Sequence, residues 1–405
     1  MTTVKLLVAV DGGTSAVKTA IQHAQLTHVQ PHLLVELSEH DAHNYVIESR
    51  GKVPHGLLTL DGRFFAYGDY ANTKRPMARS PRGAARYTDM DGSYMPYLFS
   101  AAIAAHCQAL WTHGNKTIAH IAEGLARRLR NADTIEIVLI TVIPPLDKTF
   151  TRNMRQSFMQ WQGANRTVSV GMWIGSDYIV KELVYKHMSI ISEPEGGFYT
   201  WYYTIDGVKA RQKAEQRVKI GKTLVIDGGA RTIDFMSFDT EGKVGIHASV
   251  PVGINDVLDA LLPMLHNKFA NVLNGQQLSM QTLRQALVPE QTRNGRTNSI
   301  MLRGKTYDIT EEVAIAMSHL MREYKLAYDQ IAGGGVEVAT IVLTGGGHIL
   351  LQPYLADLLL HQNVDFATSV ADLQFANVQG CAVWANRLRA MRVLDQALLW
   401  DAIMA

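Results

Sequence analysis

Two short acidic and glycine-rich stretches carry the residues best suited to chemistry. Each places an aspartate and two glycines directly after an apolar run: Asp11, Gly12 and Gly13 in the first stretch, and Asp227, Gly228 and Gly229 in the second. At a Gly-Gly turn the backbone can approach a ligand closely, and successive N–H groups there bind an anion such as phosphate. A lone aspartate would repel phosphate, so the pattern makes chemical sense with a cation, of which Mg²⁺ with its water shell suits carboxylates best. The two stretches therefore predict a site for Mg²⁺ and phosphate.

The two stretches differ at one position that changes the local charge. Lys18 follows Asp11 at the same spacing at which Asp234 follows Asp227. The lysine can offset phosphate charge, whereas the three acids can orient Mg²⁺ waters or an attacking water. Any tight hairpin can contain one Asp-Gly-Gly, but two copies in matching apolar frames indicate a pair of phosphate-binding hairpins that hold a nucleotide between them.

The elements that must position these residues are two β-hairpins. In each stretch an apolar run, the glycine turn and a second apolar run indicate strand, turn and strand. One copy stands near the head of each half of the 405-residue chain. We therefore expect two similar domains that face each other across a cleft.

A further candidate group lies on the segment between the two halves. Residues 149–162 predict a linking helix, and its Gln156 can position a water molecule. An ordinary surface glutamine is the competing interpretation, and the residues favour neither.

Three glycines near the C-terminal end form another candidate binding feature. A buried strand is predicted from Val338, and it ends at Gly345, Gly346 and Gly347. Three consecutive glycines make a turn without side chains, on which adenine and ribose can lie. Because an ordinary strand-to-helix turn needs fewer glycines, we favour the binding interpretation.

Composition narrows the class of protein. The 39 Lys and Arg nearly balance the 37 Asp and Glu, so no overall field favours nucleic acid or acidic lipid, and any role on DNA should be local or indirect. The only cysteines are Cys107 and Cys381, which excludes a disulfide framework and fits a reducing cytosol. The apolar runs are too short for a signal peptide or a membrane span. We expect a cytoplasmic protein.

The remaining pattern predicts an alternation of helices and strands. Helices are expected over residues 97–111, 117–130, 177–187, 310–332 and 380–404, strands over 134–143 and 167–174, and an aromatic-rich loop over 192–203.

With the two hairpins, the linking helix and the late glycines in hand, the chain resembles the actin-like ATPase superfamily over nearly its whole length. Within the superfamily it is most similar to the bacterial ParM/StbA group of plasmid-segregating actins. Three segments carry this likeness: the IDGGARTIDF form of the second hairpin, SEPEGGFYTWY from Ser192, and FANVQG from Phe375. The resemblance implies an α/β fold of two ribonuclease H-like domains with inserted subdomains around a nucleotide cleft.

The resemblance also implies domain boundaries. Domain I would comprise residues 1–150, with an inserted subdomain at about 31–75, and would be completed by residues 380–405. Domain II would comprise residues 151–379, with an inserted subdomain at about 256–335.

The same resemblance implies roles for individual residues. Asp11 would order Mg²⁺ waters, and Asp227 would be the main catalytic carboxylate that also holds Mg²⁺ through water. The implied phosphate-binding residues are Gly12, Gly13, Thr14, Lys18, Gly228, Gly229 and Thr232, and the implied adenosine-binding residues are Gly345, Gly346 and Gly347. The water-polarising residue of the linking helix has no unambiguous match, which leaves Gln156 open. Arg231 departs from the small polar residues usual in the second hairpin, so an extra positive charge is expected near the phosphates.

The implied function is that of a filament-forming ATPase that moves or segregates DNA, as in plasmid partition. Its cofactors would be Mg²⁺ and ATP, with GTP not excluded. Its partners would be further copies of itself and a DNA-binding adaptor protein, with no direct sequence-specific DNA binding and no membrane. One alternative is a small-molecule kinase of the same superfamily, with Asp227 as the base. The other is a membrane-tethered division protein, suggested by Arg387, Arg389 and Arg392 on the last helix, although Asp395 and Asp401 interrupt its basic face.

Overall fold

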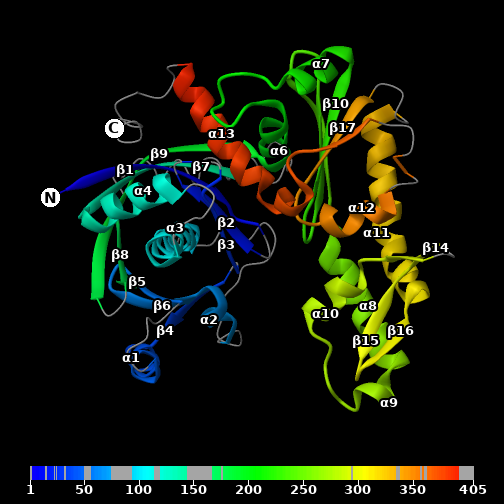
Figure 1. The fold of residues 1–405 in the computed structure, drawn as a ribbon, viewed down its shortest axis with the longest axis horizontal. Coiled ribbons are helices and arrows are strands. Elements are labelled where there is room, and N and C mark those ends of the chain that lie inside the picture. The colour runs from blue at the N-terminus through cyan, green and yellow to red at the C-terminus, as the bar shows by residue number, and fades with distance from the viewer. Residues whose placement is uncertain are drawn as a thin grey trace. The chain divides into compact units, whose positions relative to one another are not determined.

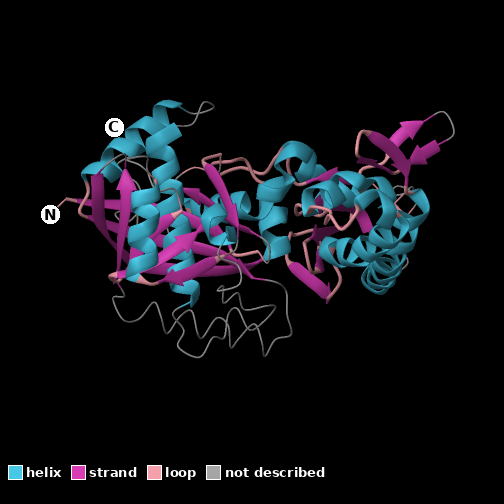
Figure 2. Cartoon of the chain, turned by 90° about the horizontal axis from the view of Figure 1, so that it is seen from below, coloured by secondary structure: helices cyan, strands magenta, loops and turns pink. Residues whose placement is uncertain are grey.

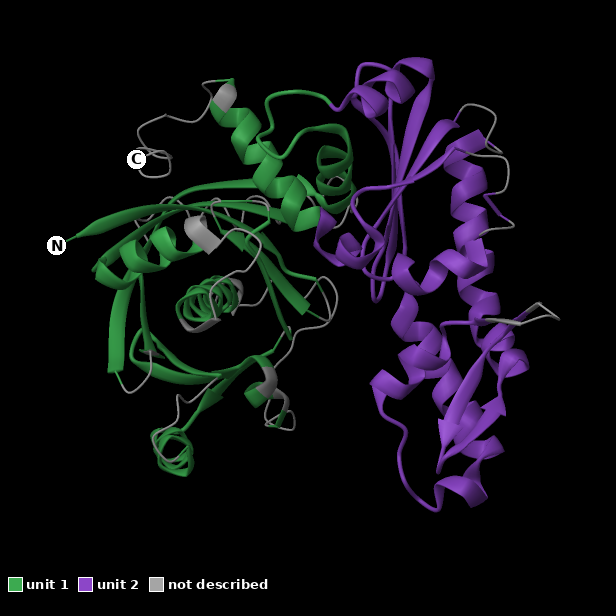
Figure 3. Ribbon diagram, in the orientation of Figure 1, with its two compact units in different colours: residues 1–210, 377–405 green, residues 211–376 purple. Residues whose placement is uncertain are grey.

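The chain divides into two compact units. The computed structural model describes residues 2–13, 16–21, 23, 25–31, 33–49, 56–73, 94–113, 119–143, 167–174, 177–292, 295–333, 338–355, 358–359 and 363–391. Unit 1 comprises Met1–Ala210 and Asn377–Ala405, and unit 2 comprises Arg211–Ala376 (Figure 3). Both units mix helices and strands, as expected of an α/β protein (Figure 2).

Unit 1 contains a nine-stranded sheet in the order β3-β2-β1-β7-β9-β8-β5-β6-β4. The strands are β1 Thr3–Asp11, β2 Ala16–Ile21, β3 Thr27–Pro31, β4 Leu34–Leu37, β5 Leu57–Leu60, β6 Arg63–Tyr67, β7 Thr134–Ile143, β8 Thr167–Ile174 and β9 Asp177–Ser192. Strands β1, β7 and β9 run parallel, and the other pairings are antiparallel. The carboxyl ends of β1, β7 and β9 therefore meet at one edge of the sheet.

The sheet of unit 1 curls around a central helix, α3 (Tyr94–His113) (Figure 1). Residues 98–105 of this helix are buried without a break, as expected of a helix that is apolar on all sides. Its polar groups are paired inside the core, where unpaired groups would be costly. The Oγ of Ser100 lies 2.7 Å from the hydroxyl of Tyr185, and Nδ1 of His106 lies 2.8 Å from Oγ1 of Thr19.

Helices α6 and α13 cross at two glycines. The helices of unit 1, besides α3, are α1 Glu39–Glu48, α2 Gly68–Thr73, α4 Ala119–Asn131, α6 Glu193–Tyr202 and α13 Ala376–Ala390. A Cβ atom on Gly380 of α13 would lie 1.8 Å from the carbonyl oxygen of Gly196 on α6, so any side chain there would clash with backbone. Next to the crossing, the rings of Tyr199 and Trp384 stack at 4.7 Å. The SEPEGG and FANVQG segments thus pack against each other.

Unit 2 is built on a five-stranded sheet in the order β12-β11-β10-β17-β18. Its strands are β10 Lys222–Gly228, β11 Ile233–Phe238, β12 Val244–Val250, β17 Val338–Thr344 and β18 Val364–Phe366, and two small hairpins add β13 Glu290–Thr292, β14 Gly295–Thr297, β15 Ser299–Leu302 and β16 Lys305–Asp308. Its helices are α7 Gln212–Ile220, α8 Ile254–Lys268, α9 Ala270–Leu273, α10 Met280–Ala286, α11 Thr310–Ala332, α12 His348–Leu355 and the 3₁₀ helix η4 Val370–Phe375. One apolar core joins the sheet to α8, α10, α11 and α12.

Several expectations from the sequence are confirmed. The two hairpins form as predicted, with β1 antiparallel to β2 and β10 antiparallel to β11. Helix α11 spans residues 310–332, and Gly333, which follows its last residue, adopts the left-handed conformation that ends a helix (φ 57°). No helix within the described ranges is long and apolar enough to cross a membrane.

The helix predicted over residues 177–187 is wrong, because this segment belongs to strand β9. The strand pairs with β7 along the whole of β7 and with β8 on its other side. The polar residues of this segment recur at helical spacing, since Lys181 and Glu182 are followed by Lys186 and His187, although in the strand Lys181 is buried and Val180 is exposed. The pairing places β8 and β9 in the sheet of unit 1, which extends to Ala210, whereas the predicted domain boundary followed residue 150.

The loop predicted over residues 192–203 is also wrong, because α6 forms there. The backbone N–H of Ser192 donates to Oε2 of Glu195 at 2.6 Å, and Pro194 stands in the first turn. A Ser-x-x-Glu sequence with an early proline is a helix start signal that the aromatic content of the segment obscured. The last helix starts at Ala376 and not at Gly380, and residues 392–405 lie outside the described residues.

The α6 and α13 crossing makes a prediction for stability. Gly380→Ala should destabilise the protein by about 1–3 kcal/mol, because the added methyl group overlaps the Gly196 carbonyl. Gly124→Ala is a matched control on α4, where a Cβ would meet no atom within 4 Å, and it should stabilise the protein by up to about 1 kcal/mol. Urea denaturation of both variants measures the effects. Equal effects of the two substitutions would contradict the crossing.

Candidate functional site

The first hairpin holds a buried ion pair at the end of β1. The strand register places Asp11 directly opposite Lys18, and Nζ of Lys18 donates to Oδ2 of Asp11 at 2.7 Å. The side chain of Asp11 is only 2% exposed and that of Lys18 only 16%. A buried carboxylate is costly unless it is paired, and the lysine meets that need. The lysine predicted to offset phosphate charge is therefore held by the neighbouring aspartate in this structure.

The turn of the first hairpin lies against this ion pair. A Cβ atom on Gly13 would lie 3.1 Å from Ala16 O, 3.6 Å from Oδ1 of Asp11 and 3.7 Å from Nζ of Lys18. The space beside the pair thus suits a residue without a side chain. Gly12 is buried in the same turn. Thr14 lies outside the described residues.

The second hairpin repeats the register of the first with a different charge. Asp227 stands directly opposite Asp234, at the positions that correspond to Asp11 and Lys18. Both side chains are buried, and Oγ1 of Thr232 donates to Oδ2 of Asp234 at 3.0 Å. Directly opposed residues of an antiparallel pair share one face of the sheet. Two carboxylates that share a face in this way suit a cation as ligand.

The late glycines lie against the second hairpin. Gly345 has a φ of +83°, and a Cβ on it would lie 2.0 Å from Oδ1 of Asp227. The backbone N–H of Gly347 donates to Gly228 O at 2.7 Å, and a Cβ on Gly347 would lie 2.6 Å from the same oxygen. Close backbone approach to the hairpin therefore requires two of the three glycines. Gly346 has more room, since a Cβ there would lie 3.3 Å from Cβ of Gln374.

A buried histidine, which the sequence analysis did not single out, supports the same turn. Nδ1 of His348 lies 3.0 Å from Gly228 N and 2.6 Å from Thr344 O. A neutral Nδ1 accepts from the Gly228 N–H in one tautomer and donates to the Thr344 carbonyl in the other. Burial lowers the pKa of His348 to about 4, so the ring is neutral near pH 7. The sequence feature that could have identified His348 is its position directly after the three glycines.

A second residue that the sequence analysis missed is Glu193. The register aligns Asp11 with Val142 and Val142 with Ile191, so Glu193 follows β9 at the edge of the sheet that bears Asp11. Glu193 is buried at the start of α6. Burial raises the pKa of the Cys381 thiol, and the charges of Asp11, Glu195 and Glu193 raise it further. Gln156 lies outside the described residues.

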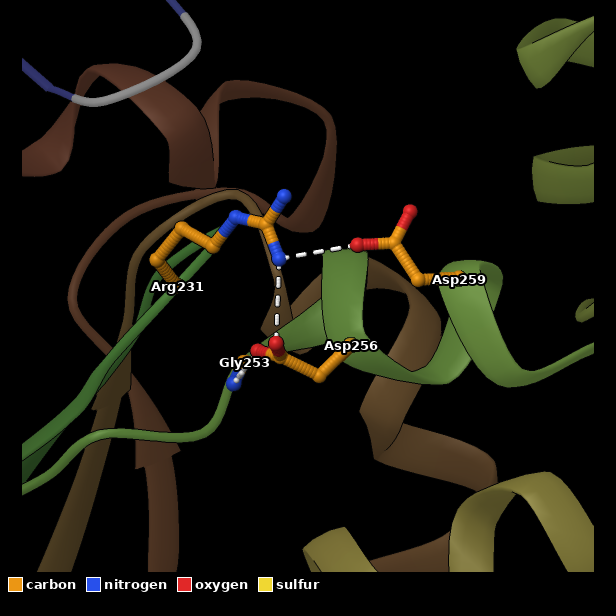
Figure 4. A network of polar contacts seen from close by, with 4 residues as sticks. All are labelled: Arg231, Gly253, Asp256 and Asp259. Atoms are coloured by element: carbon orange, nitrogen blue, oxygen red, sulfur yellow. Dashed lines mark hydrogen bonds and ion pairs between the residues drawn. The ribbon is translucent and has the colours of Figure 1, made fainter. Parts of the chain in front are cut away.

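The turn of the second hairpin carries Arg231, whose charge is paired. Its Nη1 lies 3.0 Å from Oδ1 of Asp256 and 2.9 Å from Oδ2 of Asp259, both on α8 (Figure 4). The extra positive charge expected near the phosphates is therefore held by two carboxylates in this structure.

The structure brings the candidate residues together in two groups. The group in unit 1 contains Asp11, Gly12, Gly13 and Lys18, with Glu193 at the same edge of the sheet. The group in unit 2 contains Asp227, Gly228, Gly229, Thr232, Gly345, Gly346 and Gly347. Each group combines a glycine turn with buried carboxylates.

Comparison with known proteins identifies the fold. Residues 225–357 match the family model of the C-terminal part of the archaeal MreB-like actin homologues. The whole structure is similar to the crystal structure of Ta0583, an archaeal actin homolog, with a TM-score of 0.65 and 18% identity over 94% of this chain and 99% of that chain. This chain has the actin-like fold. The fold that the resemblance implied is thereby confirmed.

Other actin-like structures lie at a similar distance. Apo psk41 ParM gives a TM-score of 0.62 with 14% identity over 97% of this chain and 100% of that chain. Bacillus thuringiensis ParM with ADP gives a TM-score of 0.59 with 13% identity over 95% of this chain and 99% of that chain. Structures of Ta0583 with ADP and of Bacillus thuringiensis ParM with AMPPNP also match. Among curated proteins, none matches the sequence. The likeness to the ParM group that the sequence motifs indicated thus extends to the fold.

The contact between Gly345 and Asp227 makes the next prediction. Gly345→Ala should destabilise unit 2 by more than Gly275→Ala. Both glycines have a positive φ (+83° and +79°), where alanine is strained, but only at Gly345 would a Cβ meet other atoms. The strain alone costs about 1–2 kcal/mol, and the overlap with Asp227 adds to it. Thermal unfolding of the two variants measures the difference. Equal losses would show that the actin-like turn does not need this close approach.

Stability should also fall as the pH drops below 6.5. The pKa of His348 is about 4 in the fold and near 6.5 in the unfolded chain, so between these values the unfolded state binds more protons. Once the pH has fallen below both pKa values, the free energy of unfolding should be lower by up to roughly 3 kcal/mol. Burial also lowers the pKa of His106 well below 6.5, so this histidine adds to the slope. Urea denaturation between pH 7 and pH 4 measures it. His348→Gln should flatten the slope, and an unchanged slope in this variant would contradict the assignment.

Proposed function

We propose that this protein is a nucleotide-dependent, filament-forming ATPase that moves or segregates DNA. The observation that carries the proposal is the pair of register-matched hairpins, one in each unit, with Asp11 and Asp227 at equivalent positions. Actin-like proteins with ADP or AMPPNP bound share the fold, which supports a nucleotide as the ligand. The likeness to ParM structures supports the DNA-segregating class within the superfamily.

The residues present fit a nucleotide with Mg²⁺. Asp11 and Asp227 would hold the ion through water, since Mg²⁺ keeps several waters and prefers carboxylate oxygens. The phosphates would be held by Gly12, Gly13, Thr14, Lys18, Gly228, Gly229 and Thr232, and the adenosine by Gly345, Gly346 and Gly347. When bound, Mg²⁺ neutralises charge on the phosphates. The same donors suit ATP and GTP.

The side chains of the two hairpins have different tasks in hydrolysis. Lys18 has three donors on Nζ, so it can donate to a phosphate oxygen while Asp11 keeps it in place. Asp227 orients the attacking water and accepts its proton, and a base of this kind contributes typically 10²- to 10⁴-fold to the rate. Asp234, held by Thr232, places a second carboxylate opposite Asp227, and oxygen ligands of this kind suit the waters of Mg²⁺.

Glu193 takes the part that the sequence analysis gave to Gln156. It starts the helix that follows the third parallel strand of unit 1, at the edge that bears Asp11. A carboxylate in this place polarises a water molecule by accepting its hydrogen bond.

Assembly follows from the contacts expected of an actin-like protein. Head-to-tail contacts are heterologous and do not close, so subunits add into filaments above a critical concentration. The triphosphate state favours assembly and hydrolysis weakens the contacts. A separate DNA-binding adaptor would connect the filament to its cargo, because the 39 basic and 37 acidic residues leave the protein without a strong positive field.

Light scattering with Mg-ATP tests the proposal. Wild-type scattering should rise on addition of Mg-ATP and fall as ATP is spent. Asp227→Ala should bind nucleotide, hydrolyse it at least about 100-fold more slowly and keep the scattering high. Asp329→Ala is the control, because Asp329 is an exposed acid on α11, and it should behave as the wild type.

Two results would contradict the proposal. If calorimetry shows that the wild type binds no nucleotide, the proposed ATPase activity is contradicted. A wild type that binds ATP, stays monomeric across a range of salt and turns over only with an added hydroxyl acceptor would be a small-molecule kinase. Pelleting with vesicles would indicate the membrane-tethered alternative.

A further inference from the structure

The turn of the second hairpin is attached to the beginning of α8. The carbonyl oxygen of Ala230 accepts a hydrogen bond from Asn255 N at 2.8 Å. Gly253, which precedes α8, packs on the same peptide, because a Cβ on it would lie 2.5 Å from Arg231 N. One side of the turn is therefore bound to α8, and its position depends on that helix.

Arg231, Asp256 and Asp259 reinforce this attachment, and we call them the turn clamp. Both ion pairs of the clamp use Nη1 of Arg231 (Figure 4). Asp256 also accepts a hydrogen bond from Gly253 N at 2.8 Å through its other oxygen, Oδ2. This aspartate stands in the first turn of α8, where the helix dipole favours negative charge. The clamp thus joins the side chain of the turn to the residue that caps the helix.

The core of unit 2 fixes the helix to which the turn is clamped. Val257, Leu258, Leu261 and Leu265 of α8 are buried in the same apolar cluster as α11. The clamp residues themselves are partly exposed, with side-chain exposures of 40% for Arg231, 37% for Asp256 and 57% for Asp259. Exposed ion pairs add little to global stability. The effect of the clamp is therefore expected on the orientation of the turn and not on the folding of the unit.

We propose that Arg231 is a positioning residue of the phosphate-binding turn, and that it couples nucleotide binding to order at the start of α8. The proposal rests on the proposed function, because it assumes that the turn binds phosphate. Both contacts use Nη1, so the guanidinium is attached to the start of α8 at one point and its charge is shared with two carboxylates there. Coupling is reciprocal, so nucleotide should order the start of α8 by as much as the clamp favours nucleotide.

Nucleotide affinity in clamp variants tests the proposal. Arg231→Gln and Asp259→Asn should both weaken Mg-ATP binding by roughly threefold to fivefold. Each substitution breaks an ion pair of the clamp, and exposed ion pairs contribute little free energy. The double variant should be no weaker than Arg231→Gln, because both changes remove one unit. Arg231→Lys should stay near the wild type, since one ammonium group can meet both carboxylates. Arg322→Gln, on the exposed face of α11, is the control and should leave affinity unchanged.

The opposite pattern would overturn the proposal. If Arg231 contacts phosphate itself, Asp259→Asn frees a cation and tightens binding, while Arg231→Lys loses as much affinity as Arg231→Gln. Calorimetry at two salt concentrations separates the two patterns.

A measurement without nucleotide keeps the clamp testable if the proposed function fails. Amide hydrogen exchange at residues 254–257 should be faster in Arg231→Gln than in the wild type, with the urea midpoint of both proteins unchanged. Equal exchange rates in the two proteins would show that Arg231 does not hold the start of α8. Faster exchange in a protein that binds no nucleotide would keep the clamp as a structural contact and remove the coupling.

Discussion

Burial of a carboxylate at the end of the first strand of each hairpin is the constraint on which the rest of the site depends. Asp11 and Asp227 are each 2% exposed, and a buried negative charge needs compensation nearby. Unit 1 supplies it within the hairpin, through Lys18 on the facing strand. Unit 2 places a second aspartate at the equivalent position, so its compensation must come from elsewhere. The same hairpin geometry therefore holds an aspartate and a lysine in unit 1 but two aspartates in unit 2.

The need to pack backbone around Asp227 explains much of the chemistry of unit 2. Gly345 and Gly347 lie where a side chain would overlap the carboxylate or the carbonyl of Gly228. His348 then contacts the backbone of Gly228 and is buried without charge. The late glycines, which the sequence analysis connected with adenosine, thus have a structural reason within the protein. A turn without side chains beside the hairpin also suits a flat ligand. Packing within the protein and ligand binding are thus two separate reasons for glycine at these positions.

The arrangement of unit 1 serves to bring strand ends together. A sheet that curls around α3 aligns the carboxyl ends of β1, β7 and β9 at one edge (Figure 1). Asp11 ends the first of these strands, and Glu193 follows the last. Residues far apart in the chain therefore share an edge because parallel strands in register end together. The helix crossing at Gly196 and Gly380 holds α6, which Glu193 begins, against α13.

The sequence by itself determined the parts of this protein that depend on local patterns. Alternating and apolar runs around Asp-Gly-Gly were enough to predict both hairpins and the match of Lys18 with Asp234, and the periodicity of residues 310–332 was enough to predict α11. Only the tertiary structure decided the state of residues 177–192, because the polar residues recur at helical spacing, whereas pairing with β7 and β8 buries Lys181 and leaves Val180 exposed. It also decided that Glu193 stands at the edge of Asp11 and that Asp256 and Asp259 hold Arg231. These relations join residues of different elements, and sequence spacing carries no information about which elements will pack together.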